Sequence, residues 1–141
     1  MKAPTHLHHK PIITVDDYDA IDGKYVKNTD AKALSIGKSQ WDEADLSAKV
    51  WRHTGDRWSR QSEELPLHRV LDLCILTISS FMIDPESDFP ITSLGEKVFD
   101  KEGLTYLREY FSDNEKKLLP RIEELKRVSA LFLEKQHSKK L

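Results

Sequence analysis

A short tract of the chain gathers cations and tryptophans beside its most apolar segment. Residues 46–62 contain two tryptophans, with a lysine, a histidine and three arginines around them. Indole faces stack on nucleobases for about 1–3 kcal/mol each, and guanidinium groups bind phosphate through paired hydrogen bonds. The tract therefore predicts a site for a small anionic, partly aromatic ligand. Cross-strand pairing in an ordinary sheet explains the same residues, and that alternative stays open. The candidate ligand-binding residues are Trp51, Arg52, Arg57, Trp58, Arg60, His68 and Arg69.

The spacing of this tract predicts a β-hairpin. Residues 46–53 alternate between apolar and polar side chains, as a half-buried strand does. The Thr-Gly-Asp triplet that follows is typical of a tight turn, so the chain should return antiparallel. With the turn centred on its Gly-Asp pair, His53 faces Trp58 and Trp51 faces Arg60. Both tryptophans would then lie on one face of the hairpin.

A helix is predicted over residues 63–82, because Ser62 can cap it and a proline is tolerated in its first turn. From Val70 to Met82 the segment is apolar almost all round, interrupted by few polar residues. Such a helix is expected to be the least exposed element, at the centre of the core.

The polar line of this helix suggests a further function. Glu64, His68 and Asp72 are spaced four residues apart, so a carboxylate could orient His68 as a general base. A hydrolase using His68 is therefore a possible class. An ordinary helix face with ion pairs explains the same spacing, and no nucleophile or metal site accompanies the histidine. No catalytic residue is predicted.

Two strands should precede the hairpin, over residues 11–15 and 34–41, and residues 1–10 should form a flexible tail. After the Pro- and acid-rich loop from Pro85 to Ile91, helices are expected over residues 94–100 and 103–111 and from residue 115 or 120 to 136. The fold class is α+β: a small antiparallel sheet in the N-terminal half packed on a buried central helix, followed by two or three helices. Residues 11–141 are expected to form a single domain.

Composition excludes several classes of function. The 141 residues carry a formal net charge of −2, which gives no global attraction to long nucleic acid or a membrane surface. The single cysteine, Cys74, cannot form an internal disulfide, so a reducing, cytoplasmic location is expected. His6, His8 and His9 with four nearby aspartates do not match a calcium or zinc pattern. No metal and no cofactor is predicted.

Two parts of the sequence resemble a known family. SAKVWRHTG and WSRQSEELPLHRVLDL, within residues 47–73, are similar to a family of small uncharacterised bacterial and phage proteins. The opening THLHHKPIITVDDYDAIDG resembles the start of the same family, so the resemblance covers the first half of the chain. The family has no assigned activity and implies no catalytic residue.

The sequence thus leaves two main functional classes. The first is a non-enzymatic, oligomeric binder of a small phosphate-bearing, nucleotide-like ligand. By analogy of size and composition, such a protein would sequester a signalling molecule in phage–bacterium conflict. The second is a protein-interaction or inhibitor module, whose exposed Trp and Arg side chains form hot spots on a protein partner.

Overall fold

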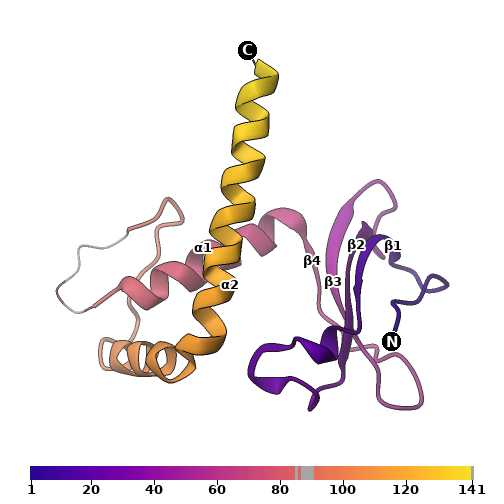
Figure 1. Ribbon diagram of the computed structural model, residues 1–141, viewed down its shortest axis with the longest axis horizontal. Coiled ribbons are helices and arrows are strands. Elements are labelled where there is room, and N and C mark those ends of the chain that lie inside the picture. The colour runs from indigo at the N-terminus through magenta and orange to yellow at the C-terminus, as the bar shows by residue number, and fades with distance from the viewer. Residues whose placement is uncertain (85, 87–90, 141) are drawn as a thin grey trace. The chain divides into compact units, whose positions relative to one another are not determined.

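The computed structural model describes residues 1–84, 86 and 91–140 and confirms the α+β class. The chain divides into two compact units, Met1–Ile75 and Leu76–Leu141. The first unit contains a four-stranded antiparallel sheet, in which the strands lie side by side in chain order (Figure 1). The strands are β1 (Lys10–Asp16), β2 (Ala31–Lys38), β3 (Leu46–Arg52) and β4 (Glu64–Pro66), and two short 3-10 helices, Tyr18–Ala20 and Gly23–Tyr25, lie between β1 and β2.

The two faces of the sheet differ in chemistry, as the alternation of residues 46–53 predicts. In the β2–β3 register Ser35 faces Lys49 and Leu34 faces Val50. Because side chains alternate along a strand, the two faces are separated residue by residue. The polar face carries Ser35, Ser47, Lys49, Trp51 and Glu64, and the apolar face carries Ile13, Val15, Leu34, Ile36, Ala48, Val50 and Leu65.

Residues 1–10, expected to be a flexible tail, supply a buried side chain to the first unit. His9 is 0% exposed, and the backbone of Ala3 donates a hydrogen bond to Asp16 Oδ1 at 3.1 Å. The division of the chain into a tail and a single domain from residue 11 stays a prediction.

The hairpin forms, but its predicted register holds only next to the turn. His53 pairs with Trp58, as expected from a turn centred on Gly55 and Asp56. The expected pairing of Trp51 with Arg60 is wrong. Lys49 faces Glu64 in β4, so the returning chain carries extra residues that bulge out between Trp58 and β4. A bulge of this kind redirects the side chains around it.

Helix α1 (Leu67–Met82) begins four residues later than predicted, because residues 64–66 pair with β3 as β4. Ser62 does not cap it; its hydroxyl donates to the carbonyl of Ser59. The expectation of a buried central helix is wrong: only Ser79 is buried, and Leu71 is 61% exposed. Most of its large apolar side chains are exposed or only half-buried.

In the second unit, residues 103–140 form one long helix, α2 (Gly103–Lys140), instead of separate helices. Pro120 lies inside it. A proline removes the hydrogen bond to the carbonyl four residues earlier, and Lys116, which loses that bond, lies in an exposed part of the helix where water can replace it. Residues 94–100 do not form the predicted helix: Leu94 lies in a turn, and residues 95–100 have no regular secondary structure. Apart from Glu86 and Ile91, the loop expected from Pro85 to Ile91 lies outside the described residues.

None of the helices described has both the length and the apolar character that a membrane crossing requires.

Gly37 is required where β1 and β2 meet, which gives a test of the sheet register. A Cβ atom at Gly37 would lie 2.0 Å from the carbonyl oxygen of Lys10. Gly37→Ala should therefore separate the strands and lower the melting temperature. The control is Gly23→Ala, where nothing lies within 4 Å and the cost is limited to a φ of 51°. An equal or smaller loss for Gly37→Ala, measured by thermal unfolding, would contradict the register.

Candidate functional site

The polar face of the sheet is organised around one buried histidine. His9 places Nε2 2.8 Å from the hydroxyl of Ser35 and Nδ1 2.9 Å from the hydroxyl of Ser47. Ser35 lies on β2 and Ser47 on β3, so the imidazole bridges two strands. All three side chains are buried. The N-terminal segment, through His9, thus links β2 and β3 on this face of the sheet.

These residues belong to a series of hydrogen bonds that runs from Trp51 to Glu64. The two end groups, an indole N–H and a carboxylate, determine the directions of the bonds next to them. Trp51 Nε1 can only donate, and it donates to Ser35 Oγ at 2.8 Å. The carboxylate of Glu64 can only accept, and the Ser47 hydroxyl donates to its Oε2 at 2.9 Å. Ser47 must therefore accept from His9 Nδ1, and Ser35 has its own proton free to donate to His9 Nε2. In the neutral ring the proton of His9 therefore lies on Nδ1, and Nε2 accepts from Ser35.

Burial supports this protonation state, because it lowers the pKa of His9 below its ordinary value of 6.5. The nearby charge of Lys49 lowers the pKa as well, whereas Glu64 acts in the opposite direction. A second ring proton would also leave the Ser35 hydroxyl without an acceptor. The neutral ring is thus favoured both by solvation and by the hydrogen bonds around it.

The carboxylate of Glu64, at the end of this series of hydrogen bonds, is a buried charge. Its side chain is 1% exposed and lies 3.4 Å from the ammonium of Lys49, which is itself 11% exposed. Burial raises the pKa of Glu64, but hydrogen bonds from the backbone of Gln40 and from Ser47, together with nearby positive charge, lower it overall. Oε1 has no hydrogen-bond partner in the described part of the chain, so Lys49 is its main compensation.

Aromatic rings continue from this network to the surface. The ammonium of Lys49 lies 4.2 Å from the ring centre of Trp51, a cation–π contact. Trp58 packs edge-on against Trp51, with ring centres 5.7 Å apart, and against His53 at 4.9 Å. Trp51 is 1% exposed, whereas Trp58 is only half-buried. Trp58 is therefore the tryptophan that a ligand can reach.

A cleft of about 750 Å³ opens over these rings and is called here the hairpin cleft. It lies between the N-terminal segment and the turn that follows β3. Cations and histidines dominate its wall, and Asp56 is its single acid. The lining residues are His6, Leu7, His8, His9, Gln40, Lys49, Trp51, His53, Asp56, Arg57, Trp58, Ser59 and Arg60.

Two arginines of the hairpin cleft carry charges that the protein itself does not neutralise. Arg57 and Arg60 are exposed, and neither forms a salt bridge with a described residue. Lys49, in contrast, is paired with Glu64. Arg57 and Arg60 are thus the cations available to an anionic ligand in this cleft.

Arg52, another predicted site residue, is bound to acids of its own chain. Its guanidinium binds Glu63 at 2.9 Å and Asp30 at 2.5 Å. The hydrogen bonds to these two carboxylates raise the pKa of Arg52. Arg52 follows Trp51 on β3 and therefore points to the other face, and it is absent from the lining of the hairpin cleft.

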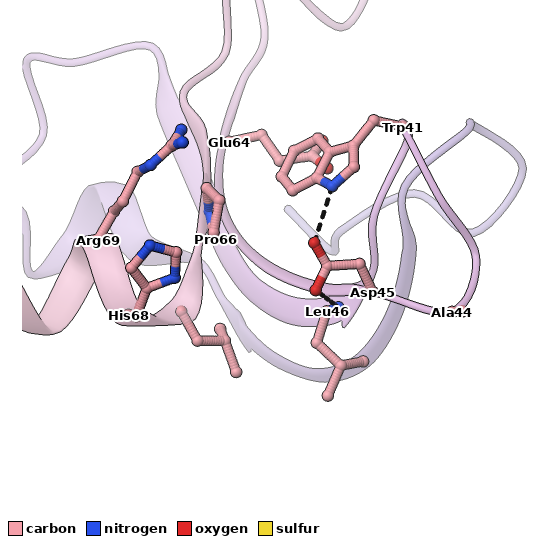
Figure 2. A pocket seen from close by; sticks show the side chains of 9 residues that line it. Trp41, Ala44, Asp45, Leu46, Glu64, Pro66, His68 and Arg69 are labelled. Carbon is pink, nitrogen blue, oxygen red and sulfur yellow. Dashed lines mark hydrogen bonds between the residues drawn. The ribbon is translucent and has the colours of Figure 1, made fainter.

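The structure places His68 and Arg69 in a different cleft, called here the helix-start cleft, of about 770 Å³. Figure 2 shows them on the first turn of α1, facing Trp41 and Asp45 of the β2–β3 loop. Trp41 donates from Nε1 to Asp45 Oδ2 at 2.9 Å. The seven predicted residues therefore divide between two clefts and the far side of β3.

The predicted helix face of Glu64, His68 and Asp72 does not form. Glu64 belongs to β4, where its carboxylate binds Ser47 and Lys49, and His68 is exposed. No carboxylate partner of His68 is found among the described residues. Within that part of the chain no group of His, Cys, Asp and Glu side chains is arranged to hold a metal ion.

Sequence reasoning missed the buried network because its members look unremarkable one at a time. His9 lies in a stretch of histidines that resembles a tail, and Glu64 suits the first turn of a helix. One signal was present: Ser47 and Lys49 share the face of Trp51 in the alternating strand. A large indole on a face of small polar residues indicates a buried polar layer that another segment must complete.

Comparison with known proteins places the first part of the chain. Residues 1–90 match a family of unknown function, DUF6530. The chain belongs to this family. The match covers all residues of both clefts and the whole of the first unit, in agreement with the resemblance seen in the first half of the sequence. No curated protein and no solved structure is similar enough to the chain to give a match.

Removing the carboxylate of Glu64 should lower the free energy of unfolding much more than removing the carboxylate of Glu63. Glu64→Ala leaves Lys49 without its carboxylate and two hydrogen-bond donors without their acceptor, and breaking a buried ion pair costs about 3–5 kcal/mol. Glu63→Ala is the matched control, because that side chain is 50% exposed and its pair with Arg52 is worth about 1 kcal/mol or less. Urea unfolding measures both losses. Equal losses would contradict the role given to Glu64.

Stability should fall as the solution is acidified from about pH 6.5. The folded state lowers the pKa of His9 below its ordinary value of 6.5, so the unfolded chain binds more protons below that pH. The contribution of His9 is therefore complete above pH 6.5 and is lost on acidification. Unfolding midpoints between pH 7.5 and 5.5 measure this slope, which should be smaller in His9→Gln. An unchanged slope in that variant would contradict the assignment.

Proposed function

We propose that this protein binds a small phosphate-bearing, nucleotide-like ligand in the hairpin cleft and does not transform it. One observation carries the proposal: Arg57 and Arg60 form no salt bridge with any described residue and line the same cleft as the accessible ring of Trp58. Guanidinium groups suit phosphate because their fixed donors match its oxygens in pairs. The ring of Trp58 offers a stacking surface for a base.

The floor of the cleft supports binding without an internal rearrangement. Trp51, His9 and Lys49 are held by hydrogen bonds and an ion pair from below. A site whose side chains are already fixed loses little conformational entropy when the ligand arrives. The surface offered to the ligand is therefore largely formed in advance.

The buried histidine of the cleft floor is not available to act as a general base. Both ring nitrogens of His9 are engaged with serine hydroxyls, and burial favours its neutral form. His68 lies in the helix-start cleft, away from Arg57 and Arg60. A ligand held in this way would be sequestered and released intact.

Thermal unfolding with a panel of mono-, di- and cyclic nucleotides tests the proposal. A ligand at 100 times its Kd raises the free energy of unfolding by about 2.7 kcal/mol. Arg60→Ala should lose most of this gain while keeping the melting temperature of the ligand-free protein nearly unchanged. Trp58→Ala should lose most of it as well, with some drop in the melting temperature of the ligand-free protein, because the ring contacts with Trp51 and His53 are removed. Added salt should weaken the binding, because part of it is ionic. Chromatography of the released ligand should show it unaltered.

Arg69→Ala is the matched control, because it removes the same charge from the helix-start cleft. It should bind as the unaltered protein does. Loss of binding in Arg69→Ala, with Arg60→Ala unaffected, would move the site to the helix-start cleft and contradict the proposal. No response to any nucleotide would also contradict it and favour a protein partner recognised by Trp58 and Arg57.

A further inference from the structure

Among the described residues, four histidines line the hairpin cleft, and the protein itself engages two of them. His9 is held by two serine hydroxyls. His53 accepts a hydrogen bond at Nδ1 from the backbone N–H of Gly55, at 3.0 Å, and its ring packs edge-on against Trp58. These two side chains therefore support the wall of the cleft.

The other two histidines, His6 and His8, are exposed on the wall that the N-terminal segment provides. Neither has a hydrogen bond or an ion pair with any described residue. Their backbone is nevertheless anchored on both sides, because Ala3 donates a hydrogen bond to Asp16 Oδ1 at 3.1 Å and His9 is buried. The segment thus holds two uncommitted imidazole rings at the cleft.

The fixed charges of the cleft are too few to balance a terminal phosphate. Arg57 and Arg60 contribute two positive charges, Asp56 cancels one of them, and Lys49 is neutralised by Glu64. A terminal phosphate carries about −1.5 to −2 charges at pH 7. The missing positive charge can come from imidazole, the side chain that changes its charge between pH 5 and 8.

His6 and His8 are better suited to this task than the other two histidines. When an imidazole is protonated, both ring nitrogens donate, and their bonds to phosphate oxygens are charge-assisted. His9 and His53 would each lose a hydrogen bond on protonation, because one ring nitrogen of each already accepts one. His6 and His8 have no such bond to lose.

We propose that His6 and His8 complete the anion site of the hairpin cleft, and that its ligand carries a terminal phosphate group. The phosphate lies between the two arginines of the hairpin and the two histidines of the N-terminal segment, and the histidines take up a proton from water as it binds. This inference rests on the proposed function and narrows it. The ligand is a nucleoside phosphate with a doubly charged end, and not a cyclic nucleotide, whose phosphodiester carries one charge.

Titration calorimetry at pH 7.5, in two buffers of different ionisation enthalpy, tests the inference. The probes are the common ribonucleoside 5′-monophosphates, each compared with its 3′,5′-cyclic counterpart. A terminal phosphate has a second pKa of about 6, so it is almost fully ionised and any proton taken up goes to the protein. The monophosphate of the accepted base should bind about tenfold more tightly than its cyclic form. Its binding should take up about one proton per ligand.

The double variant His6→Gln, His8→Gln removes both rings and leaves the arginines in place. Its affinity for the monophosphate should fall about tenfold, and its proton uptake should disappear. Its melting temperature without ligand should stay unchanged, because neither ring is bonded to the protein. His68→Gln is the matched control: it removes an exposed histidine from the helix-start cleft and should change neither the affinity nor the uptake.

The possible outcomes separate this inference from the proposed function. Binding of a monophosphate without proton uptake, or with equal affinity in the double variant, would overturn the inference and leave the proposed function standing. Tighter binding of the cyclic nucleotides would do the same. No binding of any nucleotide would overturn both.

Discussion

The carboxylate of Glu64 is a negative charge in a side chain that is 1% exposed, and the polar face of the sheet is arranged to accommodate it. The backbone of Gln40, the hydroxyl of Ser47 and the ammonium of Lys49 all approach it. Removing a charge from water costs several kcal/mol unless partners replace the lost solvent. These partners come from the β2–β3 loop and from β3, so satisfying one carboxylate fixes several segments together.

The same constraint extends outward to the candidate site. Ser47 is committed to Glu64, which orients His9, and His9 orients the hydroxyl of Ser35 beneath Trp51. Trp51 then supports Trp58 at the cleft wall. Rings that are held from below present a fixed surface to a ligand, which is what preorganised binding requires. The accessible Arg57 and Arg60 add charge to a surface whose shape is set by buried polar groups.

Periodicity predicted the parts of the fold that depend on local pattern. The strand through Trp51, the strand before it and the turn next to His53 were all visible in the alternation and turn residues of the sequence. Arg57, Trp58 and Arg60, which were chosen by residue type, line one cleft, and ligand binding there stays a prediction. The burial of His9 could not be predicted, because it depends on partners 26 and 38 residues away along the chain.

Two further differences between the predicted and the observed secondary structure have related causes. Residues 64–66 have helix-start character, but pairing with β3 satisfies their backbone and delays α1 to Leu67. Pro120 suggested a helix boundary, yet α2 continues through it at an exposed position where one missing hydrogen bond is tolerated. In both cases the surroundings of the segment outweighed its local preference.

The protonation state of His9 tests the central claim most directly. Long-range proton–nitrogen NMR correlation distinguishes the two neutral tautomers of a histidine ring from each other and from the charged form. At pH 7 the account predicts a neutral ring with its proton on Nδ1, and this signal should be lost in His9→Gln. A neutral ring with its proton on Nε2 would contradict the directions assigned to both hydrogen bonds of His9. A charged ring at pH 7 would contradict the bond that Ser35 donates to it.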